Sequence, residues 1–275
     1  MDNRPIVFLD SGIGGIPYCG DFLSRNPEEP VVYFADRAHF PYGGRDREDL
    51  RKILRETTEN LAARENPKMM VLACNTATVS ALSFLREQFP RLLFVGTVPA
   101  VKPAALASKT RRIGVMGTRR TINDPCITEL AARYGGGCSI VSVAAPELVD
   151  FVEYQYTSAG AELRRRAVLP YLEQFRNSGV DAVVLGCTHF LFLLKEFREA
   201  AAPDIVVYDS VDGISRRVES LLDREGGARR AGGGAFRRFY LREARSPADS
   251  RPAEGPQADS PRFWADKMGF DLKVL

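Results

Sequence analysis

The sequence contains no Cys-x-x-Cys pair, only two histidines and one tryptophan, and no apolar run long enough to cross a bilayer. Structural zinc sites use ligand pairs at short spacing, so we expect no metal centre. The first apolar run, Ile6 to Leu9, is too short for the core of a signal peptide. The longest uncharged stretch, Met69 to Leu85, is too short and too polar to span a membrane. We therefore expect a cytoplasmic protein without membrane contact.

Composition excludes several further classes of protein. Hydrophobic residues make up 45% of the chain and charged residues 27%, which is typical of globular proteins and excludes disordered or collagen-like chains. Five cysteines are an odd number, which disfavours a fold held by disulfides. At roughly 150 residues per domain, a length of 275 residues predicts about two domains.

Short apolar runs alternate with longer segments of helical periodicity. Continuous apolar runs of this length are typical of strands buried on both faces, and their alternation with helices predicts an α/β fold with parallel sheets. The helical segments include 47–64, 161–175 and 214–223. The expected strands are 6–9, 31–34, 69–73, 92–95, 113–116, 139–143, 182–185 and 205–208.

A segment rich in Gly, Arg, Pro and Ala, 226–261, departs from this pattern. Residues 226–251 contain seven arginines and two acidic residues, a net charge of +5, so the remainder of the +3 chain carries −2. The basic character is therefore local. We interpret 226–261 as a mobile surface insertion. Contact with nucleic acid or an acidic partner is the alternative, although no aromatic interleaving or known binding module accompanies the arginines.

Two cysteines share one sequence context. Met70 to Ala73 leads into Cys74-Asn75-Thr76, and Val183 to Gly186 leads into Cys187-Thr188-His189. Each cysteine is expected to end a buried strand and begin a helix, at the sheet edge where ligands bind in open α/β folds. A helix N-terminus favours the thiolate. We therefore predict chemical roles for Cys74 and Cys187.

The other candidates are less specific. Cys19, Cys126 and Cys138 are interpreted as packing residues, and His39 as a loop residue. His189 lies two residues from Cys187 and can orient or polarise its thiol. The glycine-rich turn 10–15 after the first strand favours a carboxylate or phosphate, although it is neither a P-loop nor a G-x-G-x-x-G motif. In the loop 40–44, Tyr42 is either structural or faces a ligand.

Two thiols on opposite sides of a small molecule suit inversion of a stereocentre. One thiolate removes the α-proton, and the other thiol supplies a proton to the opposite face. Without a cofactor, N–H and hydroxyl donors on the α-carboxylate must stabilise the carbanion. The site must also exclude water and bring the pKa of each thiol towards the operating pH.

The chain resembles the glutamate racemases of the cofactor-independent aspartate/glutamate racemase superfamily. The resemblance follows family order from residue 6 to about 220 and returns loosely at 238–240 and near Phe263. Its motifs are Asp10 to Gly15, Phe40 to Gly43, Cys74 to Thr78, Pro99 to Ala104, Gly117 to Ile122, Val149 to Glu153, Gly186 to His189 and Asp209-Ser210.

The resemblance implies interconversion of L- and D-glutamate to supply peptidoglycan synthesis, without a cofactor, in a homodimer. It implies two similar Rossmann-like or flavodoxin-like α/β domains, 1–98 with 208–275 and 99–207, with the active site in the cleft between them. Cys74 and Cys187 would be the acid/base pair, assisted by Asp10 and His189 respectively. The residues implied in substrate binding are Asp10, Ser11, Tyr42, Gly43, Asn75, Thr76, Thr188 and His189, while Thr118, Thr121 and Glu153 match positions near the site.

Three alternatives remain open at the level of sequence. The motifs indicate where the thiols lie but not how large a substrate the site accommodates, so aspartate is a second candidate substrate. A non-catalytic regulatory relative, acting on a topoisomerase through the Arg-rich segment, is another. A redox protein would form a reversible disulfide between Cys74 and Cys187.

Overall fold

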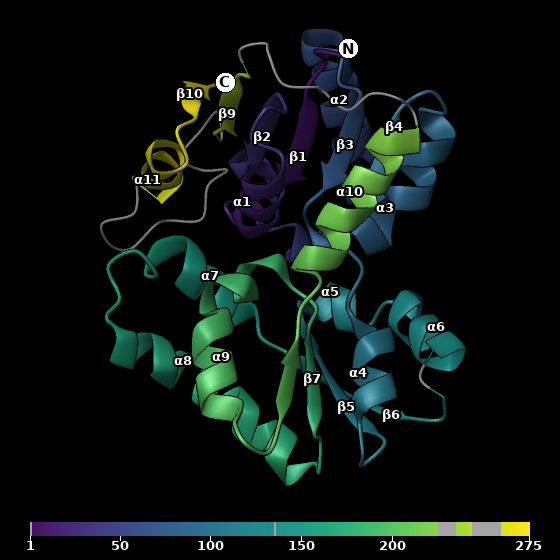
Figure 1. Cartoon of the computed structure of the whole chain (residues 1–275), viewed down its shortest axis with the longest axis vertical. Helices are drawn as coiled ribbons and strands as arrows, with labels where there is room; N and C mark the ends of the chain where they lie inside the picture. Colours follow the sequence, from purple (N-terminus) through teal and green to yellow (C-terminus); the bar gives the residue numbers. More distant parts are fainter. Residues whose placement is uncertain (1, 135, 225–234, 244–259) are drawn as a thin grey trace. The chain divides into compact units, whose positions relative to one another are not determined.

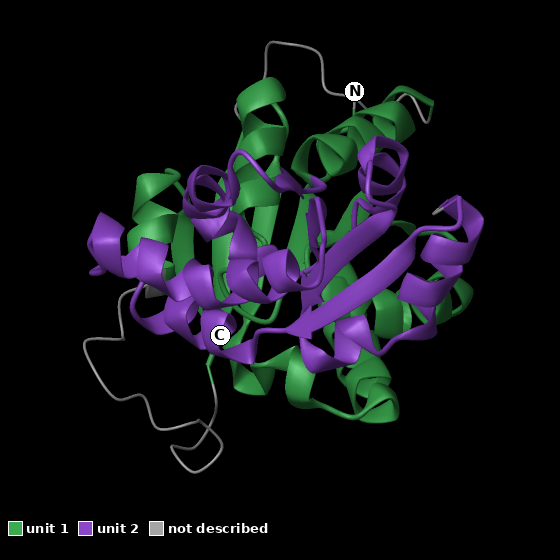
Figure 2. Ribbon diagram, turned by 90° about the horizontal axis from the view of Figure 1, so that it is seen from below, with its two compact units in different colours: residues 1–97, 211–275 green, residues 98–210 purple. Residues whose placement is uncertain are grey.

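The computed structural model describes residues 2–134, 136–224, 235–243 and 260–275. It divides into two compact units, coloured separately in Figure 2. Unit 1 comprises Met1–Thr97 together with Val211–Leu275, and unit 2 comprises Val98–Ser210. Both have α/β architecture, so the predicted fold class is confirmed (Figure 1). In the described part of the chain, no helix is long and apolar enough to cross a membrane.

Unit 1 contains a parallel sheet of six strands in the order β10-β9-β2-β1-β3-β4. The two strands at one end come from the C-terminal part of the chain, so residues far apart in sequence lie side by side. The strands are β1 (Ile6–Asp10), β2 (Val31–Asp36), β3 (Met69–Leu72), β4 (Leu93–Gly96), β9 (Arg237–Arg242) and β10 (Asp271–Val274).

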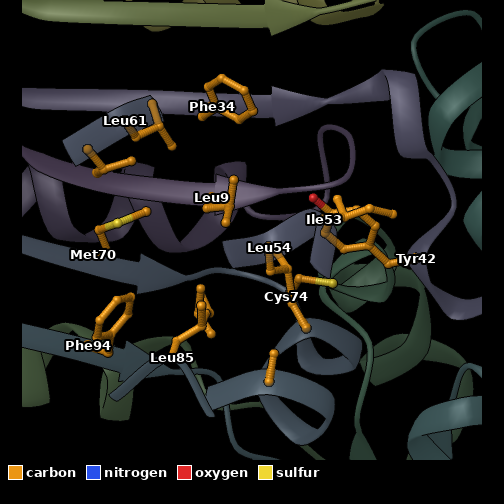
Figure 3. Close-up of a cluster of buried hydrophobic side chains, with 14 of the residues drawn as sticks. Leu9, Phe34, Tyr42, Ile53, Leu54, Leu61, Met70, Cys74, Leu85 and Phe94 are labelled. Atoms are coloured by element: carbon orange, nitrogen blue, oxygen red, sulfur yellow. The ribbon is translucent and has the colours of Figure 1, made fainter. Parts of the chain in front are cut away.

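Alternate side chains of this sheet pack into two helical layers. Val7, Leu9 and Leu72 belong to the core on the α2 and α3 side, which Figure 3 shows in part. On the other face, the rings of Phe8 and Phe22 of α1 lie 5.8 Å apart. A sheet buried on both faces explains the continuous apolar runs in the sequence. The helices of unit 1 are α1 (Ile16–Arg25), α2 (Arg47–Glu65), α3 (Asn75–Gln88), α10 (Val211–Arg224) and α11 (Ser260–Lys267), with 3-10 turns η1 (Arg37–His39) and η2 (Tyr42–Gly44).

Unit 2 contains a parallel sheet of four strands in the order β6-β5-β7-β8. On one face of this sheet, the side chains of Ile113 and Val184 form a core cluster with Ala104 of a covering helix. The strands are β5 (Arg112–Gly117), β6 (Ser139–Ala144), β7 (Ala182–Leu185) and β8 (Val206–Tyr208). The helices are α4 (Val101–Ala107), α5 (Arg119–Ile122), α6 (Pro125–Tyr134), α7 (Pro146–Tyr154), α8 (Ala161–Asn177), the 3-10 helix η3 (Thr188–Leu193) and α9 (Leu194–Ala201).

The two sheets share one topology. In unit 1 the first four strands lie in the order β2-β1-β3-β4, and in unit 2 the corresponding strands lie in the order β6-β5-β7-β8. This is the arrangement of flavodoxin-like folds. The two similar parallel domains expected from sequence are therefore present, and all eight predicted strands form within one or two residues of their predicted bounds.

The chain passes from unit 1 to unit 2 between residues 97 and 98 and returns between residues 210 and 211. The sequence predicts these two boundaries at 98/99 and 207/208. Tyr208 pairs with Val184, and Asp209 accepts a hydrogen bond from Arg198 of α9, so both residues belong to unit 2. Helix α10, which begins at Val211, packs on α1 of unit 1.

The interpretation of 226–261 as a surface insertion is wrong for its middle. Residues 237–242 form β9, which pairs with β2 on one side and β10 on the other. Phe239, Tyr240 and Leu241 are buried, because these apolar side chains continue the core of the sheet. Residues 226–234 and 244–259 lie outside the described residues.

Candidate active site

In each unit, one cysteine follows a strand that lies beside the point where the strand order reverses. In unit 1, β1 lies between β2 and β3, and Cys74 follows β3; in unit 2, β5 lies between β6 and β7, and Cys187 follows β7. Ligands in open α/β sheets bind outside the carboxyl ends of the strands at this switch point. The two cysteines therefore occupy equivalent positions, each in the place where its own sheet favours a ligand.

Cys74 lies between β3 and α3. It is the N-cap residue of α3, has an extended backbone and is 6% exposed. The N-terminus of this long helix carries a partial positive charge, which favours a thiolate. Asn75 donates from Nδ2 to the carbonyl of Thr97 at 3.0 Å, while its buried Oδ1 has no hydrogen-bond partner within the described ranges. Asn75 thus offers a fixed acceptor beside the thiol.

The glycine-rich turn after β1 is built for close packing. The amide of Gly12 donates to Oδ1 of Asp10 at 2.7 Å, and the amide of Gly15 donates to the hydroxyl of Tyr33 at 3.1 Å. A Cβ on Gly15 would lie 2.6 Å from Cβ of Ala73, so only glycine fits there. Two of the N–H groups that the sequence suggests for anion binding are therefore already used within the turn.

Tyr42 is held by a carboxylate that the sequence analysis does not single out. Its hydroxyl donates to Oδ2 of Asp36 at 2.8 Å, and Nδ1 of His39 lies 2.9 Å from both oxygens of Asp36. Burial raises the pKa of Tyr42 well above its usual value, and the charges of Asp36, Cys74 and Asp10 raise it further. Tyr42 is thus a neutral phenol close to Cys74, with its proton directed at Asp36.

Cys187 of unit 2 has a histidine and a glutamate beside it. Its Sγ lies 3.9 Å from Nδ1 of His189, and Nε2 of the same ring lies 2.7 Å from Oε1 of Glu153. All three side chains are buried, with Cys187 only 5% exposed. A carboxylate that fixes a histidine ring beside a thiol is an arrangement suited to proton transfer. Glu153 comes from α7, so sequence spacing places it nowhere near His189.

Both cysteines begin a helix, as the sequence predicts, but only Cys74 begins an α-helix. Cys187 precedes the 3-10 helix η3, and an α-helix follows only at Leu194. A 3-10 helix has poorer hydrogen-bond geometry, so its dipole is a weaker support for a thiolate. The two thiols are therefore supported differently: Cys74 by the N-terminus of α3, and Cys187 by His189 and Glu153.

The remaining predicted residues fall into the same two groups. Ser11, Tyr42 and Thr76 are buried near the carboxyl ends of the unit 1 strands, and Gly43 is half-buried in η2. Thr188 is buried in unit 2. After β5, the Oγ1 atoms of Thr118 and Thr121 lie 3.0 Å apart, and Thr118 caps α5.

The other three cysteines lie apart from these groups. Cys19 is fully buried in α1, and burial raises its pKa. Burial also raises the pKa of Cys126, and Sγ of Cys138 donates to the carbonyl of Ala105 at 3.7 Å. These environments favour inert thiols. Over the described ranges, no group of His, Cys, Asp and Glu is arranged to hold a metal ion.

The chain is similar to known racemases in sequence and structure. A family model described as Asp/Glu/Hydantoin racemase matches residues 23–216. Glutamate racemase of Herpetosiphon aurantiacus is 37% identical over 222 residues, which cover 81% of this chain and 86% of the relative. That of Sphingopyxis alaskensis is 38% identical over 223 residues, covering 80% of this chain and 83% of the relative.

A solved structure agrees with these relatives. Escherichia coli glutamate racemase, in complex with L-glutamate and the activator UDP-MurNAc-Ala, matches with a TM-score of 0.81 at 29% identity, covering 99% of this chain and 98% of that one. These comparisons identify the chain as an amino-acid racemase, an isomerase. The chain belongs to the Asp/Glu/Hydantoin racemase family.

Proposed function

We propose that this protein interconverts L- and D-glutamate by proton transfer at the α-carbon between Cys74 and Cys187, without a cofactor. The observation that carries the proposal is the equivalent position of the two cysteines, each after the strand beside the switch point of its own sheet. The relatives named glutamate racemase support the choice of substrate.

The reaction requires the two thiols to act on opposite faces of one bound substrate. The thiolate of one cysteine takes the α-proton, and the C–H electron pair passes into the α-carboxylate as an enediolate-like carbanion. The thiol of the other cysteine then gives its proton to the opposite face, and its sulfur keeps the electron pair. The net change is inversion of the α-carbon, and the cysteine that began as a thiolate ends as a thiol while the other ends as a thiolate. The reverse reaction therefore starts from the opposite protonation states of the two cysteines.

The polar groups beside each thiol are proposed to bind the substrate. Asn75 can accept at Oδ1 and donate its second amide hydrogen, since only one is used by Thr97. Tyr42 binds as a neutral phenol, because its raised pKa removes it from proton transfer. The other proposed contacts to the carboxylates and the amino group are Asp10, Ser11, Gly43, Thr76, Thr188 and His189.

We further propose that the D-glutamate formed is used for peptidoglycan. The similar Escherichia coli glutamate racemase, which was solved with the activator UDP-MurNAc-Ala, supports this proposal. The homodimer expected from the sequence stays a prediction, to be checked by sedimentation velocity.

The decisive experiment follows proton exchange at the α-carbon. The protein is incubated without added cofactor in deuterium oxide with L-glutamate or D-glutamate, and proton NMR and circular dichroism record deuterium uptake and inversion. We expect both enantiomers to racemise with deuterium at the α-carbon. Retention of the α-proton during inversion would contradict the mechanism, and faster turnover of aspartate would instead identify an aspartate racemase.

Single-cysteine variants test the two-base assignment. Cys74→Ser and Cys187→Ser should each lower racemisation at least about a hundredfold, because each removes one acid/base group. Cys138→Ser is the matched control, since Cys138 is a half-buried packing residue whose hydrogen bond a hydroxyl retains. Racemisation at the wild-type rate in both site variants would exclude the two-base mechanism.

A further inference from the structure

Unit 1 contains a cavity of about 970 Å³ that the proposed reaction does not use. Its wall is formed by β2, η1, α2 and the end of β9, with Phe34 and Leu61 as apolar lining. The volume is in the range of pockets that bind small molecules. The charged side chains of the wall are Arg45, Arg64, Arg242, Glu56 and Glu243, with His39 beside them and Leu275 also in the lining.

Two of the three arginines of this cavity, Arg242 and Arg45, lie deeper than its glutamates. The side chain of Arg242 is 23% exposed, and Arg45 and His39 are also half-buried. Arg64, Glu56 and Glu243 are exposed at the rim. Charges interact more strongly where water is partly excluded. The interior of the cavity is therefore the place where an anion would be most stable.

Arg242 is incompletely matched by the protein. Its guanidinium lies over the ring of Phe34, and Nη1 donates to Oγ1 of Thr57 at 3.1 Å. The same Nη1 reaches Oδ1 of Asp36 only at 3.5 Å, longer than a strong charged hydrogen bond. Asp36 also contacts the ring of His39 and accepts a hydrogen bond from Tyr42. Arg64 is stacked on Tyr240, and its nearest carboxylate oxygen, of Glu65, is 3.9 Å away. Both guanidiniums thus retain donors for an oxyanion, whereas Arg45 already donates from Nε to the carbonyl of His39 at 2.6 Å and from Nη1 to Oδ2 of Asp49 at 3.2 Å.

We propose that this cavity binds a phosphate group, free or as a small ester, between Arg45, Arg64 and Arg242. Three guanidiniums from separate segments suit a tetrahedral anion, which can accept hydrogen bonds from several sides, better than a planar carboxylate. The imidazole ring of His39 lines the same cavity.

The proposed phosphate site is linked to Tyr42 by contacts through the buried carboxylate of Asp36. Arg242 and His39 line the cavity and contact Asp36, and Asp36 accepts from the Tyr42 hydroxyl at 2.8 Å. A bound phosphate competes with Asp36 for Arg242 and His39. The strength of the hydrogen bond between Asp36 and Tyr42 therefore changes when phosphate binds. Binding rests on the cavity, whereas its effect on racemisation rests on the function proposed above.

Binding is measured first, by calorimetry and phosphorus NMR, with inorganic phosphate in one arm and glycerol 3-phosphate in the other. We expect saturable binding of one equivalent, weakened about tenfold by Arg64→Gln, because one charged hydrogen bond is lost. Arg55→Gln is the matched control: Arg55 is on the same helix, pairs with Glu59 and does not line the cavity. Binding should also survive Cys74→Ser, which separates this site from the catalytic proposal.

The outcomes divide clearly. Tighter binding of the ester than of phosphate identifies an organic phosphate as the ligand, and equal binding identifies the free anion. Absence of saturable binding, or binding that Arg64→Gln leaves unchanged, overturns the site. The ratio of racemisation rates with and without phosphate should differ from one in the wild type and return to one in Arg64→Gln. A ratio of one in the wild type, with binding intact, overturns the coupling to Tyr42.

Discussion

Nε2 of His189 lies 2.7 Å from Oε1 of Glu153, and both side chains are buried. The other ring nitrogen of His189 faces Sγ of Cys187 at 3.9 Å. A carboxylate at one nitrogen fixes the orientation and tautomer of the ring, so the nitrogen beside the thiol is presented in a defined state. Glu153 is therefore a positioning residue for the Cys187 thiol.

Glu153→Gln should lower kcat about ten- to a hundredfold with KM within threefold. The amide retains a hydrogen bond to the ring but removes the charge that stabilises an imidazolium, so part of the acid/base contribution is lost. The measurement is racemisation by circular dichroism across a pH series, in which the profile should shift. Glu147→Gln, on the same helix and bonded instead to Tyr171, should stay within twofold of wild type. Equal losses in both variants would indicate a structural effect.

Gly15→Ala should destabilise unit 1 by about 1–3 kcal/mol, since overpacking against the backbone has a cost of this size. The added Cβ would lie 2.6 Å from Cβ of Ala73 and 2.9 Å from its carbonyl oxygen, directly before Cys74. Racemisation should fall as well, because Ala73 precedes the thiol. Gly213→Ala, with open space around its Cβ in α10, should instead stabilise by about 0.5–1 kcal/mol. The free energies of unfolding measured in urea should therefore be lower than wild type for Gly15→Ala and higher for Gly213→Ala.

Tyr42→Phe should reduce the free energy of unfolding by about 1–2 kcal/mol. The change removes a buried hydrogen bond and leaves an oxygen of Asp36 without the phenol donor at 2.8 Å. Tyr134→Phe in unit 2 should change stability by less than about 0.5 kcal/mol. If the two variants unfold at the same urea concentration, the Asp36–Tyr42 contact contributes nothing measurable.

Stability should decline at high pH partly through Tyr171. Burial and the neighbouring Glu147 raise the pKa of Tyr171 to about 12, against about 10 in an unfolded chain. The contribution of Tyr171 to the free energy of unfolding is complete below about pH 10. It is lost progressively as the pH rises towards about 12, because the phenol ionises at lower pH in the unfolded chain than in the folded protein. Partial solvent exposure limits the effect to about 1 kcal/mol or less. Urea unfolding at pH 9 and 11 should show a smaller decline for Tyr171→Phe than for wild type.

The strands were predictable because buried parallel strands appear as continuous apolar runs. Strand β10 escaped this signal, since only Leu272 of its residues is half-buried and the others are exposed. Strand β9 has a buried centre, but the Gly- and Arg-rich composition around Phe239 suggested a loop. Pairing with β2, a long-range contact, decides its structure rather than local sequence.

The site was predictable where motifs follow strands, as at Cys74 and Cys187. The partners that support these motifs come from elsewhere in the chain. Glu153 lies 36 residues before His189, and only the family resemblance suggests it. Asp36 is six residues from Tyr42, but the link depends on the path of η1, which no local pattern specifies.

The chain position of β9 has a consequence for synthesis on the ribosome. Residues 98–210 form a continuous unit, whereas unit 1 needs residues 211–275 to complete its sheet. Since domains fold as their residues emerge, the second unit can mature while the first still has an open edge at β2. Arg242 reaches Asp36 only after β9 docks. The surroundings of Tyr42 are therefore finished only after residues 237–242 have emerged, which delays assembly of the Cys74 half beyond that of unit 2.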